Sequence, residues 1–320
     1  MKYRNLGKTG FAVSDIAHGL WGMSGWSGSE DSKSLRALQQ AVDLGCNFFD
    51  TAWAYGNGHS DQLLGQIISQ NADRRLYAAS KVPPLNQKWP PSPRDDYRDV
   101  FPADHVFHYA DLIRSNLGVD SIDLLQFHVW DDHWAEEPEF RETVERLKRD
   151  GIIRFFGLSV NRWQPGNCLA AIQTGLVDAV QVIYNIFDQS PKDQLFPLCQ
   201  ELGIGVIARV PLDEGSLGGK MGPNTKFPSD DWRSKYFGPE NLNRTLERVE
   251  KLKNDLPESM GLPELALRFI LSNPVVTTTI VGMREREHVQ QNIELSDKGP
   301  LDAGLLRQLR GHRWNRFPKN

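Results

Sequence analysis

The chain has 320 residues, of which 39% are hydrophobic and 24% charged, and its formal net charge at pH 7 is −4. This composition is ordinary for a globular protein and lacks the basic excess expected of proteins that bind nucleic acids or anionic membranes. The three cysteines, Cys46, Cys168 and Cys199, are far apart and form no CxxC pair. We therefore expect no disulfide framework, no zinc site and no other metal.

The N-terminal residues lack the apolar core of a secretory signal. No uncharged apolar run approaches the roughly 20 residues that are needed to span a bilayer. These features predict a cytoplasmic protein in a reducing compartment, with neither a membrane nor a nucleic acid as a partner. The oligomeric state is left open.

Apolar runs of strand length alternate with segments of helical periodicity along nearly the whole chain. Two short alternating runs around residues 7–10 predict an N-terminal β-hairpin. Eight strand–helix units follow the hairpin. Their predicted strands are 15–22, 47–52, 76–82, 122–129, 153–160, 179–184, 204–210 and 278–281, and their predicted helices are 31–45, 61–69, 105–117, 140–149, 167–174, 194–202, 264–271 and 287–295.

Eight consecutive units predict an α/β fold, a single (β/α)8 barrel domain over residues 1–320. A doubly wound sheet shows the same alternation, but no GxGxxG follows the first strand and GxxxxGK[ST] is absent. Residues 211–257, rich in glycine, proline and charge, are expected to form a long loop insertion. The C-terminal extension from residue 301, with Trp314 and Phe317, is expected to pack across one end of the barrel.

Polar side chains recur where the predicted strands end, which is the face of such barrels that carries active sites. Asp50 ends the second strand, Tyr55 lies in the next loop, Lys81 ends the third strand and His128 ends the fourth. A lysine ammonium beside a phenol lowers the phenol's pKa, and Asp50 would keep that lysine protonated. His128 can donate a hydrogen bond to the oxygen that Tyr55 protonates. The group suits the polarisation of a carbonyl, so the hydride must come from another molecule.

Each of these residues also has a structural interpretation. Asp50 could cap the following helix, and a lone histidine such as His128 is more often a packed core residue. Four suitable residue types at the ends of three consecutive strands favour the functional interpretation. Four tryptophans follow strand ends on the same side, where either an apolar substrate wall or ordinary packing is expected: Trp21, Trp53, Trp89 and Trp130.

These motifs make the chain resemble the aldo-keto reductase superfamily over nearly all of its length. They are Phe49-Asp50-Thr51-Ala52 with Tyr55-Gly56, Ser80-Lys81, Asp123-Leu124 with His128, Gly157-Leu158-Ser159 with Asn161, Gln181 with Tyr184-Asn185, and Gly282 with Arg284 and Asn292. The resemblance implies that Asp50, Tyr55, Lys81 and His128 form a catalytic tetrad with Tyr55 as the general acid and base.

The resemblance also implies an NADPH site that lacks a GxGxxG fingerprint. Ser159, Asn161 and Gln181 would bind the nicotinamide end. Arg209 stands where many family members have an aromatic residue that stacks on the nicotinamide, and we predict that its guanidinium stacks there. The alternatives are a pyrophosphate contact or an ion pair with Asp213 or Glu214. The adenosine end would be held by Gly282, Met283, Arg284, His288, Gln291 and Asn292.

Two functions follow from this resemblance. The first is the NADPH-dependent reduction of an aldehyde or ketone to an alcohol, or the reverse oxidation, with Tyr55 supplying the proton. The second is a redox-sensing regulatory subunit with little turnover, like the potassium-channel β subunits of this family. The chain has no long basic or disordered arm for docking another protein, which favours the enzyme.

Overall fold

The computed structural model describes residues 1–25, 28–229 and 231–314. A closed barrel of parallel strands forms its centre, and β10 closes the ring by pairing with both β3 and β9. The predicted (β/α)8 barrel is therefore confirmed, while the extent of one domain over residues 1–320 stays a prediction. The barrel strands are β3 (Ile16–Gly19), β4 (Phe48–Asp50), β5 (Tyr77–Val82), β6 (Ile122–Phe127), β7 (Ile153–Ser159), β8 (Ala179–Ile183), β9 (Gly205–Arg209) and β10 (Thr278–Gly282).

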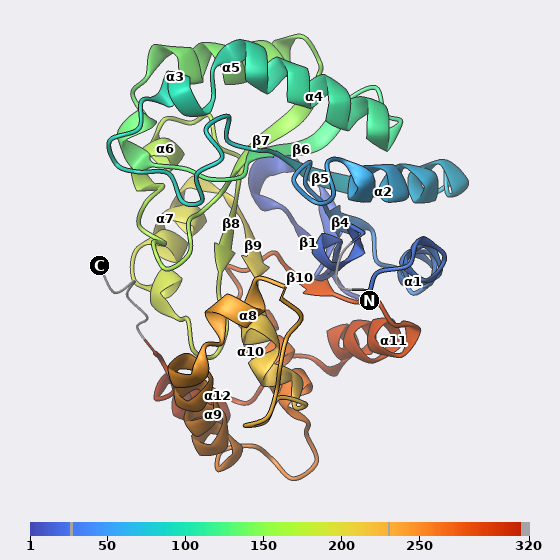
Figure 1. Ribbon diagram of the computed structural model, residues 1–320, viewed down its shortest axis with the longest axis vertical. Coiled ribbons are helices and arrows are strands. Elements are labelled where there is room, and N and C mark those ends of the chain that lie inside the picture. Colours follow the sequence, from blue (N-terminus) through green and yellow to red (C-terminus); the bar gives the residue numbers. More distant parts are fainter. Residues whose placement is uncertain (26–27, 230, 315–320) are drawn as a thin grey trace.

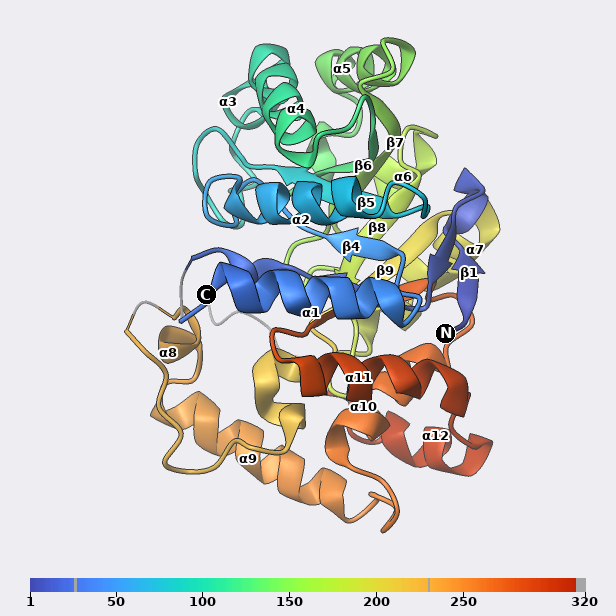
Figure 2. The same ribbon diagram turned by 90° about the vertical axis from the view of Figure 1, so that its right-hand side faces the viewer.

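Helices surround the barrel, as the two ribbon views show (Figures 1 and 2). They are amphipathic, and the apolar face of each is buried against the strands. In α1, for example, Ala37, Leu38 and Ala41 are fully buried. The helices that follow the strands in turn are α1 (Asp31–Asp43), α2 (His59–Gln70), α4 (Ala103–Leu117), α5 (Pro138–Arg149), α6 (Leu169–Gln173), α7 (Leu195–Leu202), α10 (Leu262–Leu271) and α11 (Arg286–Glu294).

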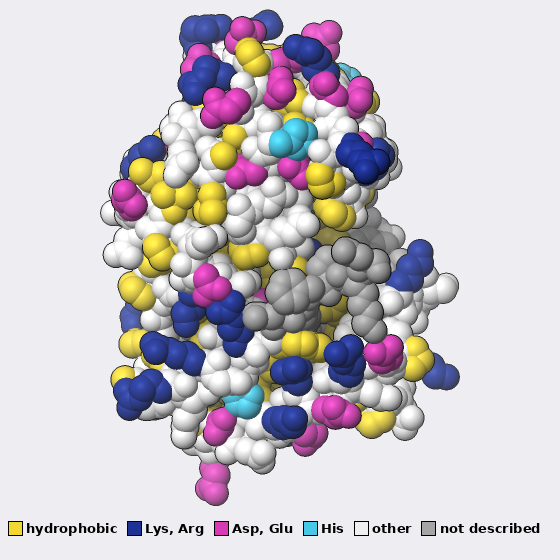
Figure 3. Space-filling model, turned by 90° about the vertical axis from the view of Figure 1, so that its left-hand side faces the viewer, with side chains coloured by type: hydrophobic (Ala, Val, Ile, Leu, Met, Phe, Trp, Pro, Cys, Tyr) yellow, Lys and Arg dark blue, Asp and Glu magenta, His cyan; other side chains and the backbone are white. Residues whose placement is uncertain are grey.

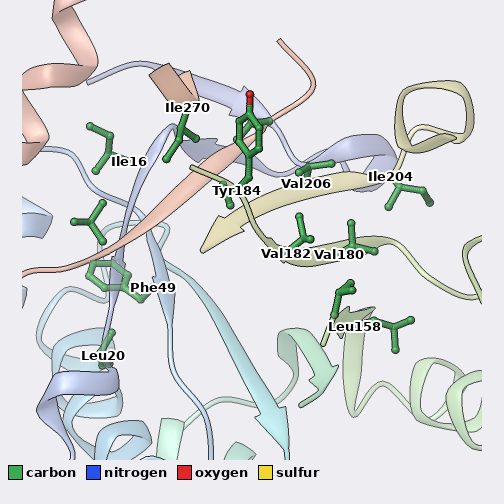
Figure 4. Packing of buried hydrophobic residues seen from close by; sticks show 14 of the residues in the cluster. Ile16, Leu20, Phe49, Leu158, Val180, Val182, Tyr184, Ile204, Val206 and Ile270 are labelled. Atoms are coloured by element: carbon green, nitrogen blue, oxygen red, sulfur yellow. The ribbon is translucent and has the colours of Figure 1, made fainter. Parts of the chain in front are cut away.

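Side chains alternate between the two faces of each barrel strand. On β8, Val180 and Val182 belong to the large core between barrel and helices, and Figure 4 shows them near Val206 of β9. Ala179 belongs instead to the smaller core inside the barrel. Gln181, two residues further along, therefore points toward the interior at the end where the strand stops. This alternation brings polar residues from several strand ends into one place.

An N-terminal hairpin of β1 (Tyr3–Asn5) and β2 (Ala12–Ser14) is present, as predicted. Leu6 and Phe11 in its turn pack inside the barrel with Phe48 and Leu124. Gly205, the first residue of β9, leaves room for this plug, because an added Cβ would lie 2.5 Å from a methyl carbon of Leu6. The hairpin therefore closes the barrel end at which the strands begin.

The segment predicted as an insertion contains both loop and helix. It holds the 3-10 helix η5 (Asp213–Gly218), the short helix α8 (Arg233–Tyr236) and α9 (Pro239–Lys253). On the face drawn in Figure 3, lysine and arginine side chains lie over both the upper end and the lower half of the molecule, with acidic side chains among them. The other short helices are α3 (Tyr97–Val100), η1 (Gly7–Thr9), η2 (Trp21–Met23), η3 (Asp132–Trp134), η4 (Ser190–Lys192) and η6 (Leu295–Lys298).

The C-terminal helix α12 (Ala303–Arg310) lies outside the helical ring in both ribbon views (Figures 1 and 2). Its chain then reaches the loop after β8, where the backbone N–H of Trp314 donates to the carbonyl of Phe187 at 2.8 Å. Gln189 of the same loop also donates through Nε2 to the carbonyl of Leu309 in α12 at 2.9 Å. The expectation that the extension packs across one end of the barrel stays a prediction. Phe317 lies outside the described residues. Within the described chain, none of the helices has the length and apolar character that a membrane span requires.

Candidate active site

A cavity of about 810 Å³ lies where the barrel strands end and the following loops begin. Its lining includes Asp50, Tyr55 and His128, and Lys81 lies fully buried beside them. The structure thus brings together the four residues that the sequence placed at three strand ends. No cluster of metal-ligating side chains is found among the described residues.

Asp50 and Lys81 form a buried ion pair at the floor of this cavity. The Nζ atom of Lys81 donates to Asp50 Oδ2 at 2.8 Å and to the carbonyl of Thr51 at 2.7 Å. Burial opposes the charge on Lys81, but Asp50 and Tyr55 outweigh it and raise the pKa of the ammonium group. Lys81 is therefore charged at neutral pH.

Tyr55 lies in the loop between β4 and α2, and Lys81 Nζ is 5.1 Å from the centre of its ring. Removal of the phenol from water raises the pKa of Tyr55, and the charges of Lys81 and Arg209 lower it without reversing this effect. The sequence prediction of a lowered pKa is therefore wrong in its net direction, because it left out the cost of burial. The phenol is protonated at neutral pH and can give up its proton.

His128 follows β6 and presents its ring to Tyr55, with the two ring centres 5.7 Å apart. Burial lowers the pKa of His128 well below its usual range, and the charges of Lys81 and Arg209 act in the same direction. The imidazole is therefore neutral and has one N–H to donate. Its Nδ1 atom is buried and has no hydrogen-bond partner among the described residues.

Gln181 supports this group from the opposite side of the barrel. Its Nε2 donates to Asp50 Oδ1 at 2.7 Å, so the two carboxylate oxygens of Asp50 hold Gln181 and Lys81 respectively. Gln181 also lines the cavity, as expected of a cofactor-binding residue. Sequence reasoning missed its contact with Asp50, because 131 positions separate the two residues.

Ser159, the last residue of β7, and Asn161, two residues further on, line the cavity. The side chain of Asn161 makes hydrogen bonds to other protein groups. Its Nδ2 donates to the carbonyl of Trp130 at 2.6 Å and to Gln164 Oε1 at 3.2 Å. Its Oδ1 accepts from the Trp130 backbone N–H at 3.3 Å. Asn161 thus joins the loops after β6 and β7, and both of its amide protons are engaged.

Arg209 ends β9 and lines the cavity. Its Nη2 donates to the carbonyl of Val160 at 3.0 Å, and its Nε is buried without a partner among the described residues. The ion pair considered at Glu214 is instead made by Arg162, with Nη2 and Oε1 2.5 Å apart. Burial and the charge of Arg162 lower the pKa of Arg209 to about 10, which leaves it charged at neutral pH.

Three of the residues predicted for the adenosine end line the cavity: Gly282 at the end of β10, Arg284 in the turn after it and His288 on the first turn of α11. The stem of Arg284 rests on Gly22, where an added Cβ would lie 3.1 Å from Arg284 Cδ.

Three other residues predicted for this end do not line the cavity formed by the described residues. Met283 is buried, and its carbonyl accepts from His18 Nε2 at 3.0 Å. Gln291 and Asn292 lie about one helical turn further along α11 than His288, and Gln291 is exposed while Asn292 is buried. Their predicted contact with the adenosine end of the cofactor stays a prediction.

Two of the four tryptophans line the cavity: Trp21 and Trp89 do so, with 37% and 46% of their surfaces exposed. The substrate-wall interpretation is wrong for Trp53 and Trp130. Trp130 is fully buried in an aromatic cluster behind the loop, and Trp53 packs against Tyr109 of α4 with ring centres 5.2 Å apart. Their loops turn both indoles away from the cavity and toward the helices.

Sequence reasoning missed a group of cavity residues on the loop after β7 and on the insertion. Arg162 lies near the rings of Trp163, Trp232 and Tyr236, at 4.8–5.5 Å from their centres. Residues 210–239 show no clear periodicity, so no sequence signal identified this cluster. The polar and aromatic cavity residues that were missed on these segments include Arg162, Trp232 and Arg233.

In a comparison with known protein families, the model of the aldo/keto reductase family matches residues 15–313 of this chain. An NADH-specific methylglyoxal reductase of Escherichia coli is 27% identical, over 97% of this chain and 98% of its own. A probable voltage-gated potassium channel subunit beta of Arabidopsis thaliana is 30% identical, over 94% of this chain and 93% of its own.

A solved structure with the same fold is that of an aldo-keto reductase from Bacillus halodurans in its holo form. The TM-score is 0.77 at 24% sequence identity, and the match covers 100% of this chain and 98% of that one. The likeness extends over the barrel and the elements around it.

Proposed function

The chain belongs to the aldo/keto reductase family, and on this premise we propose that it is an NADPH-dependent oxidoreductase that reduces an aldehyde or ketone to the alcohol. The observation that carries the proposal is the group formed by Asp50, Tyr55, Lys81 and His128 at the cavity floor. It combines a protonated phenol, a charged lysine and a neutral imidazole. We also propose a cytoplasmic location, which the three free, buried cysteines support.

The bound nicotinamide supplies the hydride that reduces the carbonyl carbon. Tyr55 gives its phenolic proton to the carbonyl oxygen, and the positive charge of Lys81 stabilises the phenolate that remains. His128 donates a hydrogen bond to the same oxygen as negative charge develops on it. Asp50, held by Gln181, keeps Lys81 charged and in place.

The cavity residues suit a cofactor that is both planar and anionic. Ser159 and Gln181 offer polar groups beside the reacting residues, and the buried Nε of Arg209 has no partner among the residues that the structure describes. Arg284 and His288 lie at the other end, near the N-terminus of α11, where backbone N–H groups favour anions. We assign the nicotinamide to the first end and the adenosine phosphate to the second.

The proposal is tested by following the oxidation of NADPH by the purified protein with a panel of aldehydes and ketones. Turnover with at least one carbonyl, and a higher kcat/KM for NADPH than for NADH, is expected. Preference for NADH would contradict the cofactor assignment alone. Inactivity toward the whole panel, together with slow single-turnover oxidation of tightly held cofactor, would favour the second candidate, a redox-sensing subunit, which the potassium channel relative supports.

Arg284→Ala is expected to weaken NADPH binding by about 10- to 100-fold while changing NADH binding little. A charge-assisted hydrogen bond to the 2′-phosphate is worth roughly 1.5–3 kcal/mol, and only NADPH carries that phosphate. Fluorescence titration measures both affinities. Arg286→Ala is the matched control, because this neighbouring arginine is exposed and donates to Gln40. Equal losses for the two cofactors would show that Arg284 does not bind the phosphate.

Arg209→Gln is expected to strengthen NADP⁺ binding relative to NADPH binding. A guanidinium stacked on the nicotinamide places a positive charge beside a ring that becomes cationic on oxidation, and glutamine removes that charge. Titration of wild type and variant with both redox forms gives the ratio of affinities. An unchanged ratio would rule out stacking and favour the pyrophosphate contact, which treats both redox forms alike.

A further inference from the structure

Asp61 lies on the first turn of α2 and is not one of the four residues at the cavity floor. Its side chain is fully buried, and its Oδ1 accepts from Ser80 Oγ at 3.0 Å. Its Oδ2 atom is also buried, and none of the described residues makes a hydrogen bond to it. A buried carboxyl group with one unpaired oxygen is costly, so this position merits a functional explanation.

The contacts of Asp61 connect the segments that carry the proposed acid. Ser80 is the residue before Lys81 on β5. Thr51, whose hydroxyl lies near the Asp61 carboxyl group and shares a hydrogen bond of 2.5 Å with Ser60 of α2, supplies the carbonyl that accepts from Lys81 Nζ. Asp61 itself begins the helix that follows the loop of Tyr55. A single carboxyl group therefore ties the end of β4, the end of β5 and the start of α2 to one another.

Asp61 also acts through its charge. Burial raises the pKa of Asp61 to about 7, Lys81 lowers this pKa and Asp50 raises it further. The neighbouring helices α1 and α4 bury only uncharged residues. Lys81 and Asp50 are therefore the charged side chains that act on Asp61 from the elements packed around it. Such coupling is reciprocal, so an ionised Asp61 favours the protonated form of Lys81.

We infer that Asp61 is a positioning residue for the proposed reaction. It holds the loop of Tyr55 in register with Lys81 through Ser80 and Thr51. When ionised, it adds a negative charge that keeps Lys81 protonated as the solution becomes alkaline. The inference rests on the proposed function, because it assigns Asp61 a part in the same proton transfer.

The test compares the kcat profiles of wild type and Asp61→Asn from pH 5 into strongly alkaline solution, where Lys81 loses its proton. Asparagine keeps the size of the side chain and an oxygen for Ser80, but it cannot ionise. The two profiles should have the same shape below about pH 6, where Asp61 is protonated. In strongly alkaline solution, where Lys81 loses its proton, the activity of the variant should fall at a pH lower by about half a unit or more than that of wild type, because Lys81 has lost a favourable charge.

Two further variants separate charge from position. Asp73→Asn, which neutralises an exposed aspartate just past the end of α2, should leave the profile unchanged. Asp61→Ala removes the contact with Ser80 and should lower kcat by about tenfold or more. Its affinity for NADPH should stay within about twofold of wild type, because Asp61 does not touch the cavity and this loss is one of orientation.

Thermal melting at several pH values tests the ionisation without any substrate. The pKa of Asp61 is raised in the folded state, so the unfolded chain loses this proton first, and stability falls as pH rises from about 4 to 7. The melting temperature of Asp61→Asn relative to wild type should therefore increase between pH 5 and 8. A difference in melting temperature that stays constant between pH 5 and 8 would contradict the ionisation of Asp61 in this range.

The outcomes separate the two proposals. A wild type that reduces none of the carbonyls would refute the proposed function, whatever the melting curves show. An active wild type whose pH profile superimposes on that of Asp61→Asn, with Asp61→Ala turning over at the wild-type rate, would refute the inference about Asp61 alone.

Discussion

Tyr55→Phe is expected to lower the rate of carbonyl reduction by about 10²–10⁴-fold, the usual contribution of a general acid. The substitution removes one hydroxyl group and keeps the ring that faces His128 across 5.7 Å. The barrel and the cofactor end of the cavity are untouched, so NADPH affinity should stay near the wild-type value. Steady-state kinetics and fluorescence titration on the same preparation give both quantities.

The matched control is Tyr109→Phe. Tyr109, on α4, packs against Trp53 and is not among the residues that line the cavity. This variant should turn over at the wild-type rate. If Tyr55→Phe keeps more than about a tenth of wild-type kcat, another group supplies the proton and the assignment of Tyr55 is wrong.

Lys81→Met is expected to lower the free energy of unfolding by about 3–5 kcal/mol, the range found when one partner of a buried ion pair is removed. Methionine fills a similar space but leaves Asp50 charged and 1% exposed. Of the two side chains that bind Asp50 in wild type, Lys81 and Gln181, only Gln181 is then left. Urea denaturation at pH 7 measures the loss. Turnover should fall as well, because the phenolate of Tyr55 loses its stabilising charge.

A double-mutant cycle with Asp50→Asn separates the pair from its surroundings. The variant with both changes should recover a large part of the stability that Lys81→Met loses, since no buried charge then stays unpaired. Simply additive losses would show that the two residues contribute independently. Because the pKa of Lys81 is raised, the contribution of the pair is fully present at neutral pH and is lost only in strongly alkaline solution.

The positions of the four floor residues could be predicted because each depends on local sequence. An apolar run fixes where a strand lies, and in a (β/α)8 barrel all strands end at the same face. Asp50, Lys81 and His128 therefore had to meet once the strand ends were known, and Tyr55 follows Asp50 by only five positions. Glycines with left-handed φ, such as Gly45 and Gly203, follow several helices, where this backbone conformation disfavours residues with a Cβ.

What the sequence did not reveal depends on contacts between distant segments. Gln181 reaches Asp50 across the barrel, and Arg162 takes the ion pair with Glu214 that was considered for Arg209. The direction of a side chain in a loop is equally hidden, which is why the sequence left both a substrate wall and ordinary packing open for Trp130. The net pKa shift of Tyr55 depends on burial, a quantity that exists only once the chain is folded.

The closure of the ring by β10 has a consequence for the chain as it is synthesised. Strands β3 to β9 can pair with one another in the order in which they emerge, but β3 and β9 then each keep an unpaired edge, and such edges promote aggregation. Both edges are covered only when β10 is added. The same segment brings Gly282, Arg284 and His288 to the cavity. This wall of the cavity is therefore complete only once both strand edges are paired, so under the proposed function the cofactor binds after the barrel has closed.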